Sequence, residues 1–271
     1  MQCPLCSGRH LRRVYQDKKR DFSAFRCRRC EIVFNDRVYR VGTQDSTESI
    51  FTPNRIHASS LERTRRLTAD IRQTIRKMVP RGRLLDVGCG LGEFLSLFPP
   101  EHYEVQGVEP SQVAAEHASQ KFGISVCADH YRQNLFNSQR FDVITALQVF
   151  EHLRDPRQFL AAVYEHLRPG GVVVIDVPSY NNPRFLFYRL TGLSLIVKRD
   201  FIPSHLFYYT RRTLVDLAAS AGFRIRKVTC GRYSVKFGST KPVLRAMLTP
   251  IDWIANRIGV GGIVLYSTKP R

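Results

Sequence analysis

The chain has 271 residues and is strongly basic, with 42 Lys and Arg against 23 Asp and Glu and a formal net charge of +19. Hydrophobic residues make up 43% of it, enough for one α/β domain and a small appendage, and no apolar run is long enough to span a membrane. The excess charge favours anionic partners such as nucleic acid, phosphate-bearing substrates or acidic membrane surfaces, unless it is simply a solvated basic surface.

Residues 1–40 carry two Cys-x-x-Cys pairs, Cys3/Cys6 and Cys27/Cys30, with a predicted β-hairpin (YQDKKRDFSAFRC) between them. Four thiolates at this spacing can close a tetrahedral Zn²⁺ site, so we predict a zinc ribbon with a structural metal ion. Redox-active cysteines are the alternative. The odd total of seven cysteines argues for a reduced compartment, and no apolar stretch follows the first ten residues, so we expect a cytoplasmic protein without a signal peptide.

The segment 41–80 is predicted to be a polar linker followed by a basic helical segment. Apolar residues recur at roughly helical spacing from 55 to 79 among many Arg, and a Pro-Arg-Gly sequence then ends the pattern. From 81 to 271 the patterns of strands and helices alternate, which is typical of a parallel sheet with right-handed crossovers. The expected strands are RLLDVGC, EVQGVEP, ISVCAD, FDVITAL, GVVVIDV, FRIRKVTC and GIVLYSTK, and the expected helices are 92–98, 111–122, 156–168 and one running from a Thr210 cap to Gly222.

The predicted fold is therefore a Rossmann-like α/β domain over 81–271, a seven-stranded, mostly parallel sheet with helices on both faces, beside the small zinc ribbon. Two insertions, 180–209 and 233–260, leave the carboxyl ends of strands, where ligands bind in such sheets, so we predict that they form lids. The stretch 241–258 has an apolar helical stripe near Trp253 and several Lys and Arg. A helix resting on the inner membrane face is therefore an alternative to a lid.

A glycine loop, Gly88-x-Gly90-x-Gly92, follows the first strand of this domain. Glycine lets the backbone turn tightly and approach a ligand closely. The acidic Glu109 closes the second strand about 20 residues later, where a carboxylate can accept hydrogen bonds from ribose hydroxyls. The glycine spacing departs from the dinucleotide fingerprint, so a mononucleoside ligand is favoured.

The order of these motifs resembles that of class I S-adenosylmethionine-dependent methyltransferases. The resemblance covers roughly 83–225 and includes FDVITALQVFEHL and LRPGGVVVIDVP. It implies a methyltransferase with S-adenosylmethionine as cofactor, and implies that Asp86 orients the cofactor's amino group through water.

The same resemblance assigns the other cofactor-binding residues. The loop from Gly88 to Gly90 would meet the methionine part of the cofactor, and Leu147 would lie at its methionine end. Glu109 would hold the ribose and Asp129 would lie at the adenine.

Glu151 and His152, after the fourth strand, are candidates for catalysis. They are similar to the Glu-His pair of ubiquinone-type O-methyltransferases, where a Glu-x-x-Glu-His run is associated with a divalent metal. Here Gln148 stands at the first position, which weakens a metal site because hard cations prefer charged oxygens. His152 is either a general base or a packing residue at the start of a helix.

His205, in IPSHLFYYT, is the other candidate base. Relatives with this kind of lid carry a histidine near this point that faces the acceptor, and the alternative is a lid histidine bonded to backbone. Tyr208 and Tyr209 would add hydroxyl groups or an aromatic wall.

Two activities compete. The first is methyl transfer to an O or C atom of a small-molecule, sugar or lipid-linked acceptor, favoured by the Glu-His pair and the apolar insertions. The alternative is methylation of an rRNA base, favoured by the charge and the zinc ribbon. A third hypothesis, a catalytically inactive cofactor-binding scaffold, is disfavoured by the intact glycine loop and Glu109.

Overall fold

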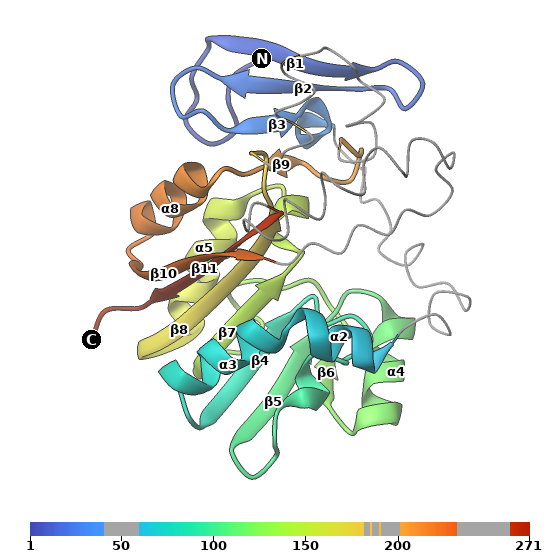
Figure 1. Ribbon diagram of the computed structural model, residues 1–271, viewed down its shortest axis with the longest axis vertical. Helices are drawn as coiled ribbons and strands as arrows, with labels where there is room; N and C mark the ends of the chain where they lie inside the picture. The colour runs from blue at the N-terminus through green and yellow to red at the C-terminus, as the bar shows by residue number, and fades with distance from the viewer. Residues whose placement is uncertain (41–59, 182–184, 186–189, 191–200, 232–260) are drawn as a thin grey trace.

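A seven-stranded sheet forms the centre of the protein (Figure 1). The computed structural model describes residues 1–40, 60–181, 185, 190, 201–231 and 261–271. The strand order is β10-β11-β8-β7-β4-β5-β6, and β11 is antiparallel to both of its neighbours while the other strands run parallel. The predicted fold class is confirmed. The strands are β4 Gly82–Val87, β5 Tyr103–Val108, β6 Ser125–Cys127, β7 Phe141–Leu147, β8 Leu167–Pro178, β10 Arg224–Gly231 and β11 Gly262–Thr268.

Both faces of this sheet are buried because successive strand residues enter two different apolar clusters. In β8, for example, Val173 and Ile175 belong to one cluster and Val172 and Val174 to the other. The first cluster contains side chains of α5 and α8, and the second contains side chains of α3. The described helices are α2 Leu61–Leu67, α3 Ala69–Met78, α4 Gln112–Phe122, α5 Pro156–His166 and α8 Arg211–Ser220.

Three of the four helices predicted in this domain are confirmed, and the one at 92–98 is wrong. Only a 3₁₀ turn, η3 (Leu95–Leu97), forms there. Gly92 adopts φ +77° just before it, and the backbone of Phe98 is extended ahead of Pro99, because proline disfavours the helical conformation in the residue that precedes it. The predicted start of α8 is confirmed by a capping box between Thr210 and Thr213.

A second, four-stranded sheet lies beside the large one (Figure 1). It consists of β1 (Leu11–Asp17), β2 (Phe22–Cys27), β3 (Val33–Asn35) and β9 (Phe207–Tyr208), in that order, and we call it the N-terminal sheet. A short 3₁₀ helix, η1 (Asp36–Tyr39), follows β3. The fourth strand of the N-terminal sheet, β9, therefore comes from the end of the inserted segment 180–209, more than half the chain away from β3.

The two sheets also share one apolar cluster. Buried Cys3, Cys27 and Phe34 of the N-terminal part belong to the same cluster as Phe150 and Tyr209. The division into 1–40, 41–80 and 81–271 stays a prediction. The linker 41–54, most of the insertion 180–209, and the insertion 233–260 with its possible interfacial helix lie outside the described residues. Within the part of the chain that the structure describes, no helix is long and apolar enough to cross a bilayer.

Candidate active site

The glycine loop follows β4 and is tied to the end of β5. The N–H groups of Gly88 and Cys89 donate to the Val108 carbonyl at 2.7 and 3.1 Å. Gly88 has φ +71°, and a Cβ there would lie 2.4 Å from Cγ2 of Val149, so only glycine fits. The loop is thus fixed on one side by β5 and on the other by the segment after β7.

Glu109 is buried next to this loop. Its Oε2 accepts from the Gly90 N–H and its Oε1 from the Ser111 N–H, each at 3.0 Å. Burial raises the pKa of Glu109, while the two backbone N–H groups act in the opposite direction. The carboxylate is therefore held rigidly at the carboxyl end of β5, as a ribose-binding group requires.

Asp86 lies under the loop, fully buried, where its Oδ1 accepts a 2.5 Å hydrogen bond from the Thr145 hydroxyl. Burial raises the pKa of Asp86 to about 7. Leu147 ends β7 and is partly buried, while Asp129 follows β6, is more exposed and pairs with Arg132 at 2.7 Å. The predicted cofactor residues thus lie at the carboxyl ends of four adjacent strands, β4 to β7, and their individual roles stay predictions.

The structure brings the three predicted catalytic residues together. Glu151 and His152 lie in the 3₁₀ helix η4 (Phe150–His152), and His205 lies just before β9. Oε1 of Glu151 is 3.8 Å from Nε2 of His152 and 4.0 Å from Nε2 of His205. The two imidazole rings are 4.8 Å apart and packed edge to face.

Burial controls the charge of this cluster. The Glu151 side chain is only 2% exposed, and neither of its carboxylate oxygens has a hydrogen-bond partner among the described residues. Burial, and secondarily Asp176, raises the pKa of Glu151 to about 8. Burial, and secondarily His152, lowers the pKa of His205 to about 3. Near neutral pH the cluster therefore holds a mostly protonated carboxyl group and a neutral imidazole.

Backbone contacts hold the cluster in place. Nδ1 of His152 donates to the Ser204 carbonyl at 2.8 Å, which leaves Nε2 as the unprotonated nitrogen of a neutral His152. The Leu206 N–H donates to the Glu151 carbonyl at 2.8 Å. These two bonds fasten the segment that carries His205 onto η4.

Comparison with known proteins identifies the family. A family model described as a methyltransferase domain matches residues 60–228. The chain belongs to this methyltransferase family. The ubiquinone biosynthesis O-methyltransferase of Saccharophagus degradans is 27% identical over 173 residues, which cover 57% of this chain and 72% of the relative. The enzyme of the same name from Psychrobacter arcticus is 25% identical over 219 residues, covering 76% and 78%.

Solved structures show the same fold. S-adenosylmethionine-dependent methyltransferases from Archaeoglobus fulgidus and Clostridium acetobutylicum each match with a TM-score of 0.52, at 21% and 16% identity. The matches cover 78% and 80% of this chain and 96% and 95% of theirs. These structures confirm the fold, and the family match confirms the predicted S-adenosylmethionine-dependent methyltransferase and its cofactor.

The methyltransferase departs from the ubiquinone-type pattern at Gln148. Its side-chain amide donates to Oδ2 of Asp176 at 2.9 Å, and its backbone has φ +59°. The potential metal ligands that remain are one carboxylate oxygen of Glu151 and one imidazole nitrogen each of His152 and His205. These three atoms lie within 4.8 Å of one another. A hard cation such as Mg²⁺, which prefers oxygen ligands, does not fit this set, whereas Zn²⁺ or Fe²⁺ would fit it.

The four predicted zinc ligands converge. The sulfur atoms of Cys3 and Cys30, and those of Cys6 and Cys27, are 3.5 Å apart, and all four lie within 4.8 Å of one another. A tetrahedral site with Zn–S bonds of about 2.3 Å has sulfur–sulfur edges of about 3.8 Å, so the cluster has the size that Zn²⁺ needs.

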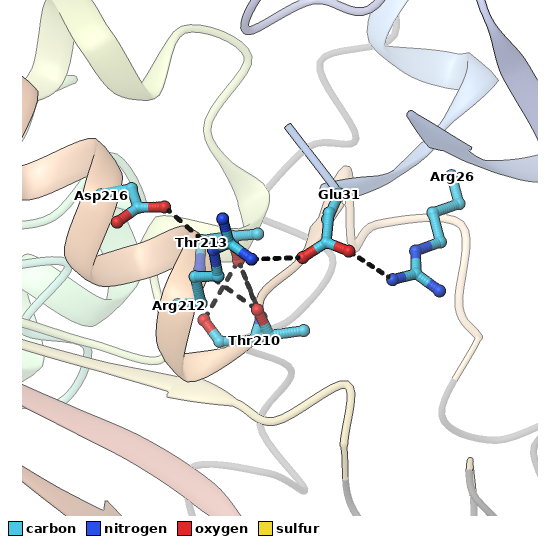
Figure 2. A network of polar contacts seen from close by, with 6 residues as sticks. All are labelled: Arg26, Glu31, Thr210, Arg212, Thr213 and Asp216. Atoms are coloured by element: carbon cyan, nitrogen blue, oxygen red, sulfur yellow. Dashed lines mark hydrogen bonds and ion pairs between the residues drawn. The ribbon is translucent and has the colours of Figure 1, made fainter. Parts of the chain in front are cut away.

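The residue that follows the second Cys pair, Glu31, also contacts the methyltransferase domain (Figure 2). Glu31, next to Cys30, accepts from Arg26 at 3.0 Å and pairs with Arg212 of α8 at 3.5 Å. Arg212 in turn lies 3.6 Å from Asp216. These side chains are largely exposed, so the pairs contribute little to stability and the shared apolar cluster holds the parts together.

Two residues of the site received less weight in the sequence. Tyr209 after β9 is buried and Asp176 near the end of β8 is partly buried. The Tyr209 hydroxyl and Oδ1 of Asp176 have no hydrogen-bond partner among the described residues. Tyr209 was predicted to add a hydroxyl group or part of an aromatic wall, and Asp176 was not predicted. An acidic residue inside an otherwise aliphatic strand is the signal that could have found it.

Proposed function

We propose that this methyltransferase transfers the methyl group of S-adenosylmethionine to a hydroxyl oxygen of a small-molecule acceptor, with His205 accepting the hydroxyl proton. The observation that carries this proposal is the cluster of buried Glu151 and His205 with partly exposed His152 at the carboxyl edge of the sheet. The relatives named ubiquinone biosynthesis O-methyltransferases support oxygen as the acceptor atom.

The chemistry needs a base and an orientation. The methyl group on a sulfonium is already activated, so the protein must align the acceptor oxygen with it and remove one proton. A neutral His205 can take that proton. The imidazolium so formed would lower the pKa of Glu151, 4.0 Å away, and Glu151 would then release its own proton to solvent and stabilise the imidazolium as a carboxylate. His152, bonded to the Ser204 carbonyl, would orient this pair.

The other assignments belong to the same proposal. Glu109 would bind the ribose of the cofactor, the loop from Gly88 to Gly90 its methionine part, and Asp129 its adenine. The four cysteines would bind a structural Zn²⁺ with no position open for catalysis.

The small-molecule acceptor of this proposal can be a sugar or a lipid-linked compound. Transfer to a carbon atom of such an acceptor is an alternative to transfer to oxygen. An RNA base is the second candidate, and its support is the charge of +19 beside the Cys-rich N-terminal part. The residues proposed to contact a membrane surface, 241–258, lie outside the described part of the chain.

The first experiment is methyl transfer from labelled S-adenosylmethionine into cell extract separated into RNA, protein, lipid, glycan and small-molecule pools. Label in the small-molecule, glycan or lipid pool is the expected result, and label in RNA alone would overturn the ranking. His205→Gln should lower the transfer rate at least 100-fold with unchanged cofactor affinity, as a general base contributes about 10²–10⁴-fold. Full turnover by His205→Gln would remove His205 from the mechanism.

A further inference from the structure

The N-terminal sheet forms backbone hydrogen bonds with the segment that carries His205. β3 pairs with β9 through Val33 and Tyr208 and through Phe34 and Phe207. The next residue of β3, Asn35, continues this pairing with Leu206, the residue just before β9. A part of the protein assigned so far to zinc binding therefore reaches the catalytic cluster through backbone pairing.

Asn35 holds both flanks of His205. Its backbone N–H donates to the Leu206 carbonyl at 2.9 Å, and its side-chain Nδ2 donates to the Pro203 carbonyl at 3.2 Å. Its Oδ1 accepts from the Arg37 N–H at 3.0 Å. The residue has 0% exposure, so these bonds form without competition from water.

The same segment is held from the opposite side by η4. Ser204 accepts from His152, and Leu206 donates to the Glu151 carbonyl. Residues 203–206 are thus fixed between the N-terminal sheet and η4, and the His205 side chain has only 11% exposure. Loss of the hydrogen bonds on either side of this segment would allow the His205 imidazole to move away from Glu151.

We propose that Asn35 is a positioning residue for methyl transfer, which keeps His205 over Glu151 by holding the carbonyl groups on either side of it. This inference rests on the proposed function only in that His205 acts on the acceptor. A displacement of about 1 Å at a reacting group costs on the order of 100-fold in rate, so a residue without substrate contact can control turnover.

An amide is required at position 35 because it donates to one carbonyl and accepts from one N–H. Asn35→Asp keeps the shape and the acceptor for Arg37 but places a carboxyl oxygen against the Pro203 carbonyl. That oxygen can donate only while the carboxyl group is protonated, so the variant is assayed at alkaline pH, where the carboxylate cannot form this hydrogen bond. The predicted cofactor residues lie at the carboxyl ends of β4 to β7 and not in the segment 203–206, so cofactor binding should be unaffected.

The test compares Asn35→Asp with Asp17→Asn. Asp17 lies in the same sheet and holds the β1–β2 turn through Arg20 at 2.7 Å, with no described contact to 203–206. The first readout is ethoxycarbonylation of the His205 imidazole by diethyl pyrocarbonate on the zinc-loaded full chain, followed by peptide mass spectrometry. We expect at least a fivefold faster reaction at His205 in Asn35→Asp and an unchanged rate in Asp17→Asn.

The second readout is turnover on the extract pool that the wild-type enzyme labels. Asn35→Asp should lower kcat at least 10-fold with unchanged KM for S-adenosylmethionine, while Asp17→Asn should keep both values. Unchanged His205 reactivity together with unchanged kcat in Asn35→Asp would overturn the inference. If no pool is labelled by the wild type, the proposed function fails, and the His205 reaction still decides whether Asn35 positions this residue.

Discussion

Gly88 allows the two constraints on the cofactor loop to be separated. Alanine at this position would adopt φ +71°, which costs an L-residue about 1–2 kcal/mol. Its Cβ would also lie 2.4 Å from Cγ2 of Val149, an overpacking that typically costs about 1–3 kcal/mol. We therefore expect Gly88→Ala to lower the free energy of unfolding by about 3 kcal/mol and to weaken cofactor binding at least 10-fold.

The double variant Gly88→Ala/Val149→Ala removes the clash but keeps the backbone penalty. It should regain roughly half of the lost stability, measured by urea unfolding, and part of the affinity, measured by calorimetric titration with S-adenosylmethionine. Val149→Ala alone is the control for the loss of the valine side chain. If Gly88→Ala binds the cofactor like the wild type, or if the second substitution restores nothing, the loop geometry argued above is wrong.

Three further predictions concern buried charge, the ribose site and the metal. In the folded protein Asp86 has a pKa of about 7, above its value in the unfolded chain, so the free energy of unfolding falls as the pH rises towards 7. This titration accounts for about 2 kcal/mol of the stability that the wild type loses between pH 5 and 7. That part of the loss should disappear in Asp86→Asn, as measured by urea unfolding at both pH values. Glu109→Ala should weaken S-adenosylmethionine binding at least 10-fold in calorimetric titration, and unchanged affinity would mean that the assigned ribose site is wrong. The purified chain should contain one Zn²⁺ by elemental analysis and unfold at lower temperature after chelation, whereas Cys27→Ser should contain none; a metal-free wild type of unchanged stability would contradict a structural zinc site.

Much of the central fold follows from local sequence pattern. Each strand from β4 to β8 is an apolar run in a region where strands and helices alternate, and the glycine loop with Glu109 fixes the cofactor edge. The incorrect prediction of a helix at 92–98 also has a local cause, because Gly92 and the proline after Phe98 restrict the backbone to a single turn.

The catalytic cluster was predictable in its residues but not in its geometry. Glu151 and His152 were found from a motif and His205 from its place in an insertion, yet nothing in the sequence specifies that they meet. That meeting depends on β9, a strand of two residues whose pairing with β3 leaves no periodic signal. Asn35 was missed for the same reason, because its partners lie far away in sequence.

The pairing of β3 with β9 also has a consequence for synthesis on the ribosome. Asn35 and Pro203 are 168 residues apart, so β3 emerges long before the strand that completes its sheet. During that interval β3 is an open edge with unpaired N–H and carbonyl groups, the kind of surface on which chains associate wrongly. If the four cysteines bind Zn²⁺ as proposed, early binding would keep β1, β2 and β3 ordered until β9 is made. Metal supply during translation would then be a determinant of the yield of folded protein.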